Sequence, residues 1–340
     1  MLASDEDILL EAERWTRQGR AVAIATVVET WGSAPRPPGS HLIIDAAGEF
    51  LGSVSGGCVE GEVIAQAQEA IGLGHCRLLE FGVADETAWK VGLSCGGRIS
   101  VFLRPLAPAI IAEINRARAS RKSCALVSGL SSGTERVAAA GALAGDALAA
   151  ELGARFAARA SGLVAGREEP TFLSVFTPSP RIIAIGAVHI SQALAPMATV
   201  AGFETIIVDP RTGFASSARF SGARLVADWP AEALKALALD AATAVALLTH
   251  EPRIDDEAAR GALSSDCFYI GALGSRKTHA RRLERLRADG FCESALARIH
   301  APIGLDIGAK SPAEIAVAIL GEIIEDLRRE QRSGSSGKAA

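Results

Sequence analysis

The stretch that decides the fold is RIIAIGAVHISQALAPMATVAGFETIIVDPR, residues 181–211. It predicts an apolar strand ending at Gly186, a helix over about 189–202, and a second apolar strand ending at Asp209. A strand, a helix and a strand of this length form a βαβ unit with parallel strands. Three further apolar runs, separated by helical stretches, extend the unit: 223–227, 244–249 and 267–274. We therefore predict a Rossmann-like, doubly wound parallel sheet over residues 178–330.

The first half of the chain has another pattern, which predicts a mixed α/β domain over residues 1–177. An opening helix precedes a β-branched strand over 21–30, and the loop WGSAPRPPG, whose prolines exclude regular structure, follows at 31–39. The later predicted elements are a hairpin of HLIID and FLGSVSG, helices over about 59–71 and 108–119, and strands near 77–82, 98–104, 124–130 and 171–176. The alanine-rich stretch before the last strand favours a helix. Two sub-units, 1–106 and 107–177, are compatible with this order.

A capping box opens the last predicted helix. Ser311 and Glu314 are spaced for reciprocal capping, and Pro312 takes the first helical position. We expect this helix to end at about Glu330 and the tail, 331–340, to be disordered.

Composition narrows the class of protein. The 340 residues are 49% hydrophobic and 22% charged, which is enough apolar material for two cores. A net charge of −4 argues against general binding of nucleic acid or anionic membranes. Six scattered cysteines without a CxxC pair argue against a disulfide scaffold and a structural zinc site. The acidic N-terminus has no export signal, so we expect a cytoplasmic protein without a transmembrane segment.

The turn after the first strand of the parallel sheet, Gly186-Ala187-Val188-His189-Ile190-Ser191, is a candidate site. Dinucleotide-binding turns follow G-x-G-x-x-G/A, in which the second glycine lets backbone amides approach a pyrophosphate. Val188 occupies that second position, which weakens the prediction of NAD or FAD and leaves a phosphate-bearing ligand open. Asp209 ends the second strand, where an acidic residue would bind ribose hydroxyls. The alternative is a doubly wound domain kept for packing or for a protein partner.

Other polar residues follow strands of the same sheet and would share its carboxyl edge. His189 and His250 would be exposed there, although a single histidine is more often structural. The residues Gly271, Gly274, Ser275 and Arg276 predict a turn that holds an anion through amides and a guanidinium. The alternative for this turn is a tight connection into a basic, solvated helix.

Two thiols in glycine turns are the candidates of the first domain. Cys58 lies in GGCVEG at the start of a predicted helix, where unpaired amides and the helix dipole favour a thiolate. Cys95 lies in SCGG, before a strand. The other four cysteines lie in or beside predicted helices and strands, where a small buried hydrophobe is the ordinary interpretation: 76, 124, 267 and 292.

Several long motifs resemble the XdhC/CoxI family. In the first domain they are ETWGSAPRPPGSHLII, GSVSGGCVEGEV and LSCGGRISVFLRPL. In the second they are GAVHISQALAPMATVAGFETIIVDPR, LLTHEP, YIGALGSRK and HAPIGLDIGAKSPAEIAVAILGEI. The motifs occur in the same order as in the family. The resemblance covers most of residues 5–327 and is weakest across 107–175. The family's turn G-A-G-H is Gly186-Ala187-Val188-His189 in this chain.

The resemblance implies a role in the maturation of molybdenum hydroxylases such as xanthine dehydrogenase and carbon monoxide dehydrogenase. A member of the family would bind molybdenum cofactor, shield it while a cysteine desulfurase partner installs its terminal sulfido ligand, and deliver it to the apo molybdenum hydroxylase. The cofactor is molybdopterin or its dinucleotide form, so a nucleotide is also a candidate ligand. The resemblance implies a chaperone without turnover of its own, and formation of a homo-oligomer is open.

This implied role assigns the candidate residues to two ends of the cofactor. Cys58 and Cys95 would face the dithiolene and molybdenum or carry a transient persulfide. The binding residues implied in the first domain are Arg36, Gly57, Glu60 and Gly96. Those implied in the second domain are Gly186, His189, Asp209, Arg211, His250, Gly274, Ser275 and Arg276. We expect the ligand in a cleft between the domains.

Two other functions remain open at this point. An NAD(P)- or FAD-dependent oxidoreductase would use the Rossmann domain, with Cys58 as a redox thiol. A docking scaffold would bind the apoenzyme and the desulfurase without contacting the cofactor. The client enzyme, the form of the cofactor, and whether sulfur or copper passes through a thiol are open as well.

Overall fold

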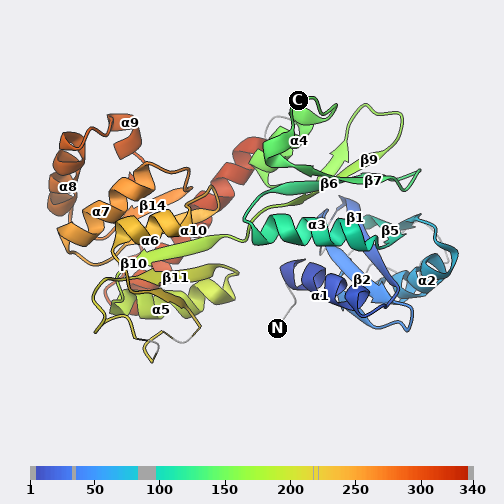
Figure 1. Ribbon diagram of the computed structural model, residues 1–340, viewed down its shortest axis with the longest axis horizontal. Coiled ribbons are helices and arrows are strands. Elements are labelled where there is room, and N and C mark those ends of the chain that lie inside the picture. The colour runs from blue at the N-terminus through green and yellow to red at the C-terminus, as the bar shows by residue number, and fades with distance from the viewer. Residues whose placement is uncertain (1–4, 33–35, 83–96, 217, 221, 336–340) are drawn as a thin grey trace. The chain divides into compact units, whose positions relative to one another are not determined.

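A computed structural model describes residues 5–32, 36–82, 97–216, 218–220 and 222–335. The chain divides between Pro178 and Ser179 into two compact units, and each has its own sheets and its own hydrophobic core (Figure 1). Within the described part of the chain, no helix combines the length and hydropathy that a membrane crossing requires.

The first unit contains an antiparallel five-stranded sheet with the order β3-β2-β1-β5-β4. Its strands are β1 (Val22–Trp31), β2 (His41–Asp45), β3 (Phe50–Gly52), β4 (Arg77–Phe81) and β5 (Arg98–Pro105). Helix α2 (Glu60–Leu73) contributes Val63, Ala67 and Ala70 to the cluster on one face. The other face packs against α1 (Asp5–Arg17) and α3 (Pro108–Ala119).

A second antiparallel sheet completes this unit, with the order β7-β6-β9-β8. Its strands are β6 (Cys124–Gly129), β7 (Glu135–Ala139), β8 (Gly162–Val164) and β9 (Thr171–Phe176), with α4 (Ala149–Ala158) over one face. The alanine-rich stretch is predicted to favour a helix, and α4 forms within it, but β7 and β8 are strands. Pairing with β6 and β9 outweighs the helix propensity of alanine there.

The second unit contains a six-stranded sheet in which every neighbouring pair is parallel, with the order β12-β11-β10-β13-β14-β15. The strands are β10 (Arg181–Ile185), β11 (Glu204–Val208), β12 (Arg224–Val226), β13 (Thr243–Leu247), β14 (Tyr269–Ala272) and β15 (Ile299–His300). This order is the one found in dinucleotide-binding folds, and the predicted Rossmann-like architecture is confirmed.

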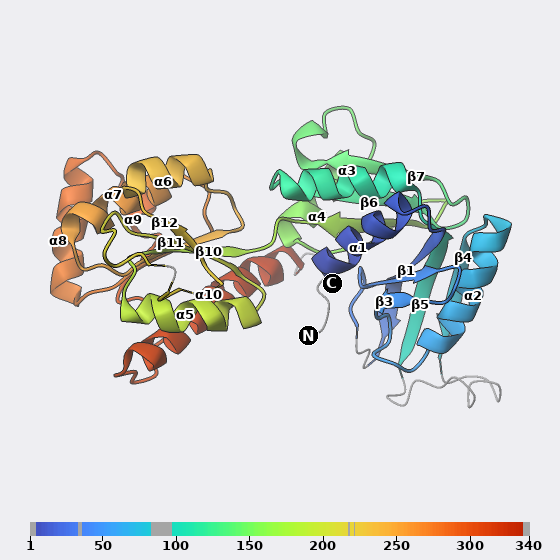
Figure 2. The same cartoon turned by 60° about the horizontal axis from the view of Figure 1, so that its bottom comes forward.

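Helices cover both faces of the parallel sheet (Figure 2). One core cluster joins it to α6 (Pro230–Leu237), α7 (Pro252–Leu263), α8 (Arg276–Ala288) and α9 (Glu293–Leu296). The other joins it to α5 (His189–Val200) and α10 (Pro312–Ser335). The strands are buried on both sides, which explains their continuous apolar runs.

The last helix begins as the sequence predicts. Glu314 accepts hydrogen bonds from the Ser311 N–H at 2.9 Å and the Lys310 N–H at 2.7 Å, while Ser311 Oγ accepts from the Glu314 N–H at 3.2 Å. The helix continues to Ser335, so the predicted end at Glu330 is wrong.

Candidate functional site

Most of the binding residues predicted in the second unit lie at one edge of the parallel sheet. They follow the carboxyl ends of four strands, β10, β11, β13 and β14, which all point the same way. The structure therefore brings to this edge Gly186, His189, Asp209, Arg211, His250, Gly274, Ser275 and Arg276. Ligands of open α/β sheets bind at this edge.

Gly186 closes the turn after β10 by a contact that only glycine permits. Its φ is +116°, and a Cβ on this residue would lie 2.7 Å from Cγ2 of Thr249. The next residue, Ala187, donates its N–H to Oδ2 of Asp209 at 2.8 Å. Val188 then caps α5 and packs against the core cluster below the helix. The turn after β10 is thus held by the turns after β13 and β11.

Asp209 is fully buried, and its carboxylate binds groups of the chain itself. Besides the Ala187 N–H, it accepts the Arg211 N–H and Nε–H at 2.9 Å each, and Nη2 at 2.7 Å. Burial alone would raise the pKa of Asp209, but the hydrogen bonds from Arg211 and Ala187 outweigh it and lower the pKa. The carboxylate predicted to bind ribose is therefore occupied in shaping the turn.

A second carboxylate, Asp255 in α7, shapes the turn after β13. It accepts the Thr249 hydroxyl at 2.6 Å and the His250 N–H at 3.1 Å. Arg282 lies 3.5 Å from it, and burial raises the pKa of Asp255. His250 has a φ of +61°, which is unusual for a residue with a side chain and is often found at functional sites. Asp255 was not among the predicted residues, although its place in the first turn after Pro252 was a usable signal.

The turn after β14 is a helix start with a side-chain cap. Ser275 Oγ accepts the Thr278 N–H at 3.2 Å, Gly274 has a φ of +134°, and Arg276 is exposed in the first turn of α8. Gly271 was predicted in this turn, but it lies within β14, where a Cβ would meet Ile303 and Tyr269 at 2.5 Å. That glycine serves packing instead.

In the first unit, Glu60 organises the loop that leads to Cys58. Its carboxylate accepts the Ser53 hydroxyl at 2.7 Å, the Ser55 hydroxyl at 2.5 Å, and three backbone N–H groups at 2.9–3.1 Å. Burial opposes the charge, yet the hydrogen bonds from Ser53 and Ser55 lower the pKa of Glu60 to about 2. Glu60 was predicted to bind cofactor, whereas in the structure both of its carboxylate oxygens bind the loop.

The same loop presents Cys58 beside open space. Ser55 Oγ accepts the N–H groups of Cys58 and Val59 at 2.9 Å each, which fixes the entry into α2. Gly57 has a φ of +114°, and a Cβ built on it would have no atom of the described residues within 4 Å. Cys58 is half-buried and forms no disulfide with another described cysteine. A ligand can therefore approach next to this thiol.

Arg36 belongs to the same end of the five-stranded sheet as Cys58. The antiparallel order places there the loop after β1, which carries Arg36, the loop after β3, which carries Cys58, and the start of β5 at Arg98. Arg36 is half-buried. Cys95 and Gly96 lie outside the described residues.

The remaining cysteines follow the prediction in part. Cys124 and Cys267 are buried and Cys76 is half-buried, but Cys292 is exposed. Cys292 precedes the four-residue helix α9, where its sulfur lies 3.1 Å from the Ser294 hydroxyl instead of in the core. Among the described residues, no group of three or more His, Cys, Asp or Glu side chains could hold a metal ion.

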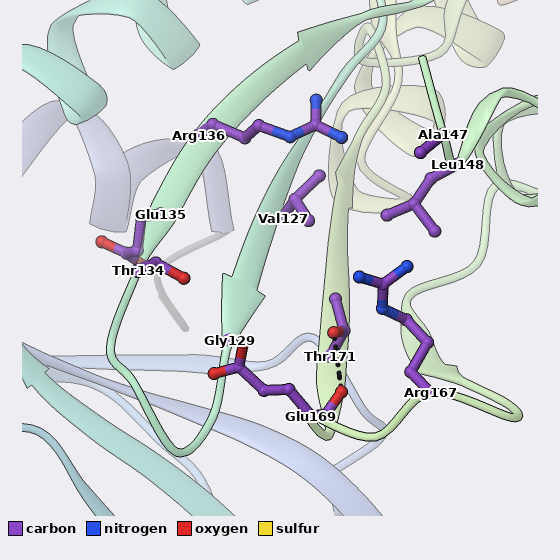
Figure 3. A pocket seen from close by; sticks show the side chains of 10 residues that line it. All are labelled: Val127, Gly129, Thr134, Glu135, Arg136, Ala147, Leu148, Arg167, Glu169 and Thr171. Atoms are coloured by element: carbon purple, nitrogen blue, oxygen red, sulfur yellow. Dashed lines mark hydrogen bonds between the residues drawn. The ribbon is translucent and has the colours of Figure 1, made fainter.

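A separate hollow of about 310 Å³ lies on the second sheet of the first unit (Figure 3). Its floor includes Val127 and Leu148, and the side chains of Arg136 and Arg167 extend across it. Arg136 is paired with Asp146 at 2.7 Å. None of the predicted site residues lines this hollow.

Comparison with known families matches both units. Residues 15–82 match the description "XdhC and CoxI family", and residues 182–323 match "XdhC Rossmann domain". Among curated proteins, the Escherichia coli molybdenum cofactor insertion chaperone PaoD is 28% identical over 90% of this chain and 83% of its own length. A Bacillus subtilis protein named as a probable component of xanthine dehydrogenase is also 28% identical, over 90% of this chain and 93% of its own.

A solved structure shares the fold along nearly the whole chain. It is a crystal structure named as a xanthine dehydrogenase from Bacillus halodurans, with a TM-score of 0.73 and 24% sequence identity over 98% of both chains. At this identity the likeness concerns the fold alone.

Proposed function

The chain belongs to the XdhC and CoxI family, and we propose that it binds molybdenum cofactor and delivers it to an apo molybdenum hydroxylase. In this proposal the cofactor is protected on the chain while a cysteine desulfurase partner installs its sulfido ligand. The observation that carries the proposal is the similarity, across both units, to the molybdenum cofactor insertion chaperone PaoD. The cofactor is cargo, and the chain supplies the groups that hold it.

The loop of Cys58 supports the proposal at the sulfur and molybdenum end of the cargo. A thiolate is a soft ligand that suits molybdenum and sulfur chemistry. The hydrogen bonds of Glu60 and Ser55 fix the backbone on both sides of the thiol, so its position is set before the cargo arrives. The described part of the chain leaves the space beside Gly57 open, which gives room for a bulky ligand.

The carboxyl edge of the parallel sheet supports the proposal at the phosphate end. His189, His250 and Arg276 are exposed there, each in a turn or first helical turn. Cationic and amide donors at such edges bind phosphate groups. Gly274, Ser275 and Arg276 would contribute the donors of the turn after β14.

The alternative of an NAD(P)- or FAD-dependent oxidoreductase fits this edge less well. Val188 takes the place of the second glycine of the dinucleotide turn. Asp209, the residue that would bind ribose, is buried and bound to Ala187 and Arg211. A nicotinamide or flavin dinucleotide would have to break these contacts to bind in the usual manner.

Anaerobic titration of the purified chain with molybdenum cofactor tests the proposal. Bound molybdenum and pterin are counted for the wild type and for Cys58→Ala, Cys95→Ala and Cys292→Ala. We expect near-stoichiometric binding by the wild type, weaker binding by the Cys58 variant or the Cys95 variant, and no change for Cys292, an exposed thiol outside the site. Absence of binding by the wild type would overturn the proposal.

A further inference from the structure

The hollow on the second sheet of the first unit takes no part in the proposed function (Figure 3). Among the described residues, none of those assigned to the cofactor lines it. Its volume of about 310 Å³ reaches the size of pockets that hold small ligands, roughly 300–1,000 Å³. It lies on the face of the sheet that Val127 of β6 shares with its strand partner Arg136 of β7 and that α4 covers. A ligand of this hollow would therefore be distinct from the cofactor.

Two carboxylates fix the walls of the hollow. Asp146 accepts the Leu148 N–H at 2.8 Å and binds the Arg136 guanidinium through both of its oxygens, at 2.7 and 2.8 Å. Glu169 accepts a backbone N–H of the turn between β6 and β7 at 2.9 Å. A Cβ on Gly129 would lie 2.4 Å from Oε1 of Glu169, so the glycine leaves room for this carboxylate. The shape of the hollow is thus set before a ligand enters.

Two guanidinium groups reach over an apolar floor and differ in their partners. Arg167 is exposed, and its side chain has no hydrogen bond or ion pair with another described residue. Arg136 donates to Asp146 through Nη1 and Nη2, which leaves its Nε–H without a partner in the described part of the chain. The floor is made by Val127 and Leu148, which are both buried. The hollow thus presents cationic donors beside a buried apolar surface (Figure 3).

The charges around the hollow favour a ligand with one negative charge. Asp146 already neutralises Arg136, and Glu135 is paired with the buried Arg104. Within the described lining, Arg167 is therefore the cation without a bound carboxylate. A carboxylate matches the planar fork of one guanidinium. A dianion such as phosphate would be repelled by Asp146 without gaining a second unpaired cation.

We propose that this hollow binds a carboxylate attached to a short apolar chain. Arg167 holds the carboxylate, and Val127 and Leu148 contact the apolar chain. The remaining donor of Arg136 is available to the second carboxylate oxygen. Two sources have this chemistry, a free carboxylic acid and the C-terminal residue of a polypeptide. The site goes beyond the proposed function and does not depend on it, because its lining residues are not those assigned to the cofactor.

Titration of the full chain with small acids, followed by ligand-detected NMR, tests this site. The probes are 4-methylpentanoate, its uncharged amide, acetate and inorganic phosphate. We expect 4-methylpentanoate to bind about tenfold more tightly than its amide, as one hydrogen bond to a charged donor gives. It should also bind about tenfold more tightly than acetate, as burial of two methylene groups gives. Equal affinity for the acid and its amide, or phosphate binding as tightly as the acid, would overturn the inference.

Peptides distinguish the two sources of the carboxylate. The tripeptide acetyl-alanyl-alanyl-leucine is compared, with a free and with an amidated C-terminus, against 4-methylpentanoate. Tighter binding of the free tripeptide than of the acid supports the site and identifies a polypeptide C-terminus as its ligand. Weaker binding of the free tripeptide than of the acid supports the site with a free acid as its ligand. Equal binding of the free and the amidated tripeptide, both tighter than the acid, would overturn the inference.

Variants assign the contacts. Arg167→Met should lose the preference for the acid over its amide, whereas Arg116→Met, which removes another exposed arginine of the first unit, should keep it. Asp146→Asn removes the charge that competes for Arg136, while its side-chain oxygen still accepts the Leu148 N–H. Its affinity for the acid should therefore rise about two- to fivefold, the effect of one exposed ion pair. An unchanged preference in Arg167→Met, with an unchanged Tm as the check on folding, would overturn the inference.

Discussion

The loop that carries Cys58 and the sheet edge that carries His250 are held by the same device, a carboxylate that accepts backbone N–H groups. Their partners differ. Among the described residues, Glu60 has only hydroxyl and amide donors, whereas Asp209 and Asp255 also face the guanidinium groups of Arg211 and Arg282. Within the described part of the chain, the loop of Cys58 is thus shaped without a cation, while the sheet edge contains arginines that the carboxylates hold in place. Removing the carboxylate of the first region should change only the shape of its loop. Removing a carboxylate of the second region should change the turn and also release an arginine side chain.

The largest effect is expected from breaking the first anchor. Glu60→Ala leaves three backbone N–H groups and two hydroxyls without their acceptor, and we expect a loss of about 3 kcal/mol in the free energy of unfolding. Denaturation by urea measures it. Glu62→Ala, an exposed neighbour in α2, should stay within about 0.5 kcal/mol of the wild type. Equal effects of the two changes would contradict the role of Glu60.

The pH dependence of the same contact has a defined sign. The pKa of Glu60 is about 2 in the folded chain, against an ordinary 4.5, so its contribution is complete above pH 4.5 and is lost as the pH falls toward 2. The Tm of the wild type should fall through this window. The Tm of Glu60→Gln should be lower than that of the wild type above pH 4.5 and should fall less as the pH is lowered. If the Tm of the two proteins fell in parallel with pH, the assignment to Glu60 would be contradicted.

A smaller effect is expected from breaking the contact between the turns of the second region. Gly186→Ala should reduce the free energy of unfolding by about 2 kcal/mol, because the new Cβ would be 2.7 Å from Thr249 at a positive φ. Gly202→Ala is the matched control. Gly202 also has a positive φ, of +85°, but no described atom would lie within 4 Å of a Cβ there, so only about 1 kcal/mol should be lost. Urea denaturation measures the free energy of unfolding of both variants. Equal losses would show that the close approach of Gly186 to Thr249 does not contribute.

The capping box of α10 sharpens the comparison, since it uses the same chemistry without burial. Glu314→Ala removes the acceptor of two N–H groups at an exposed helix start and should lower the free energy of unfolding by about 1 kcal/mol. Glu325→Ala, which removes only an ion pair with Arg329 on the same helix, should lower it by about 0.3 kcal/mol. Thermal melts at one pH compare the two, and the reverse order would refute the cap.

The smallest effect is expected at the other end of the pH range. The hydrogen bond with Glu322 raises the pKa of His300 above 6.5, and Asp326, at 3.5 Å, acts in the same direction. The protonated ring therefore stabilises the second unit below pH 6.5, and this contribution is lost as the pH rises through the folded pKa. Melts between about pH 6 and 9 should show a falling Tm that His300→Gln flattens. A slope unchanged by the substitution would rule out this contribution.

The parallel sheet was the most predictable part of the molecule. Its strands are buried on both faces, so β10, β11 and β13 appear in the sequence as unbroken apolar runs. Strands β7 and β8 could not be predicted in the same way, because they are half-exposed and contain alanine and glycine. Strand β15 has two residues and gives no pattern at all.

The candidate site was predictable in residue identity but only partly in role. Parallel strands bring Gly186, His189 and His250 to one edge, and this follows from the order of elements alone. Whether a carboxylate meets a ligand or a backbone amide depends on loop geometry, which spacing does not give. The hydrogen bonds of Glu60 and Asp209 to backbone amides were therefore not predicted, and Asp255 was not among the predicted residues.

Transfer of the cargo is the most direct test of the central claim, that this chain delivers molybdenum cofactor. The chain is loaded anaerobically, separated from free cofactor, and mixed with an apo molybdenum hydroxylase, and molybdenum is counted on each protein while the activity of the client is followed. The account predicts that molybdenum moves to the client and that activity appears faster than with an equal amount of free cofactor. Molybdenum that stays on the chain, or activation no better than that by free cofactor, would contradict it.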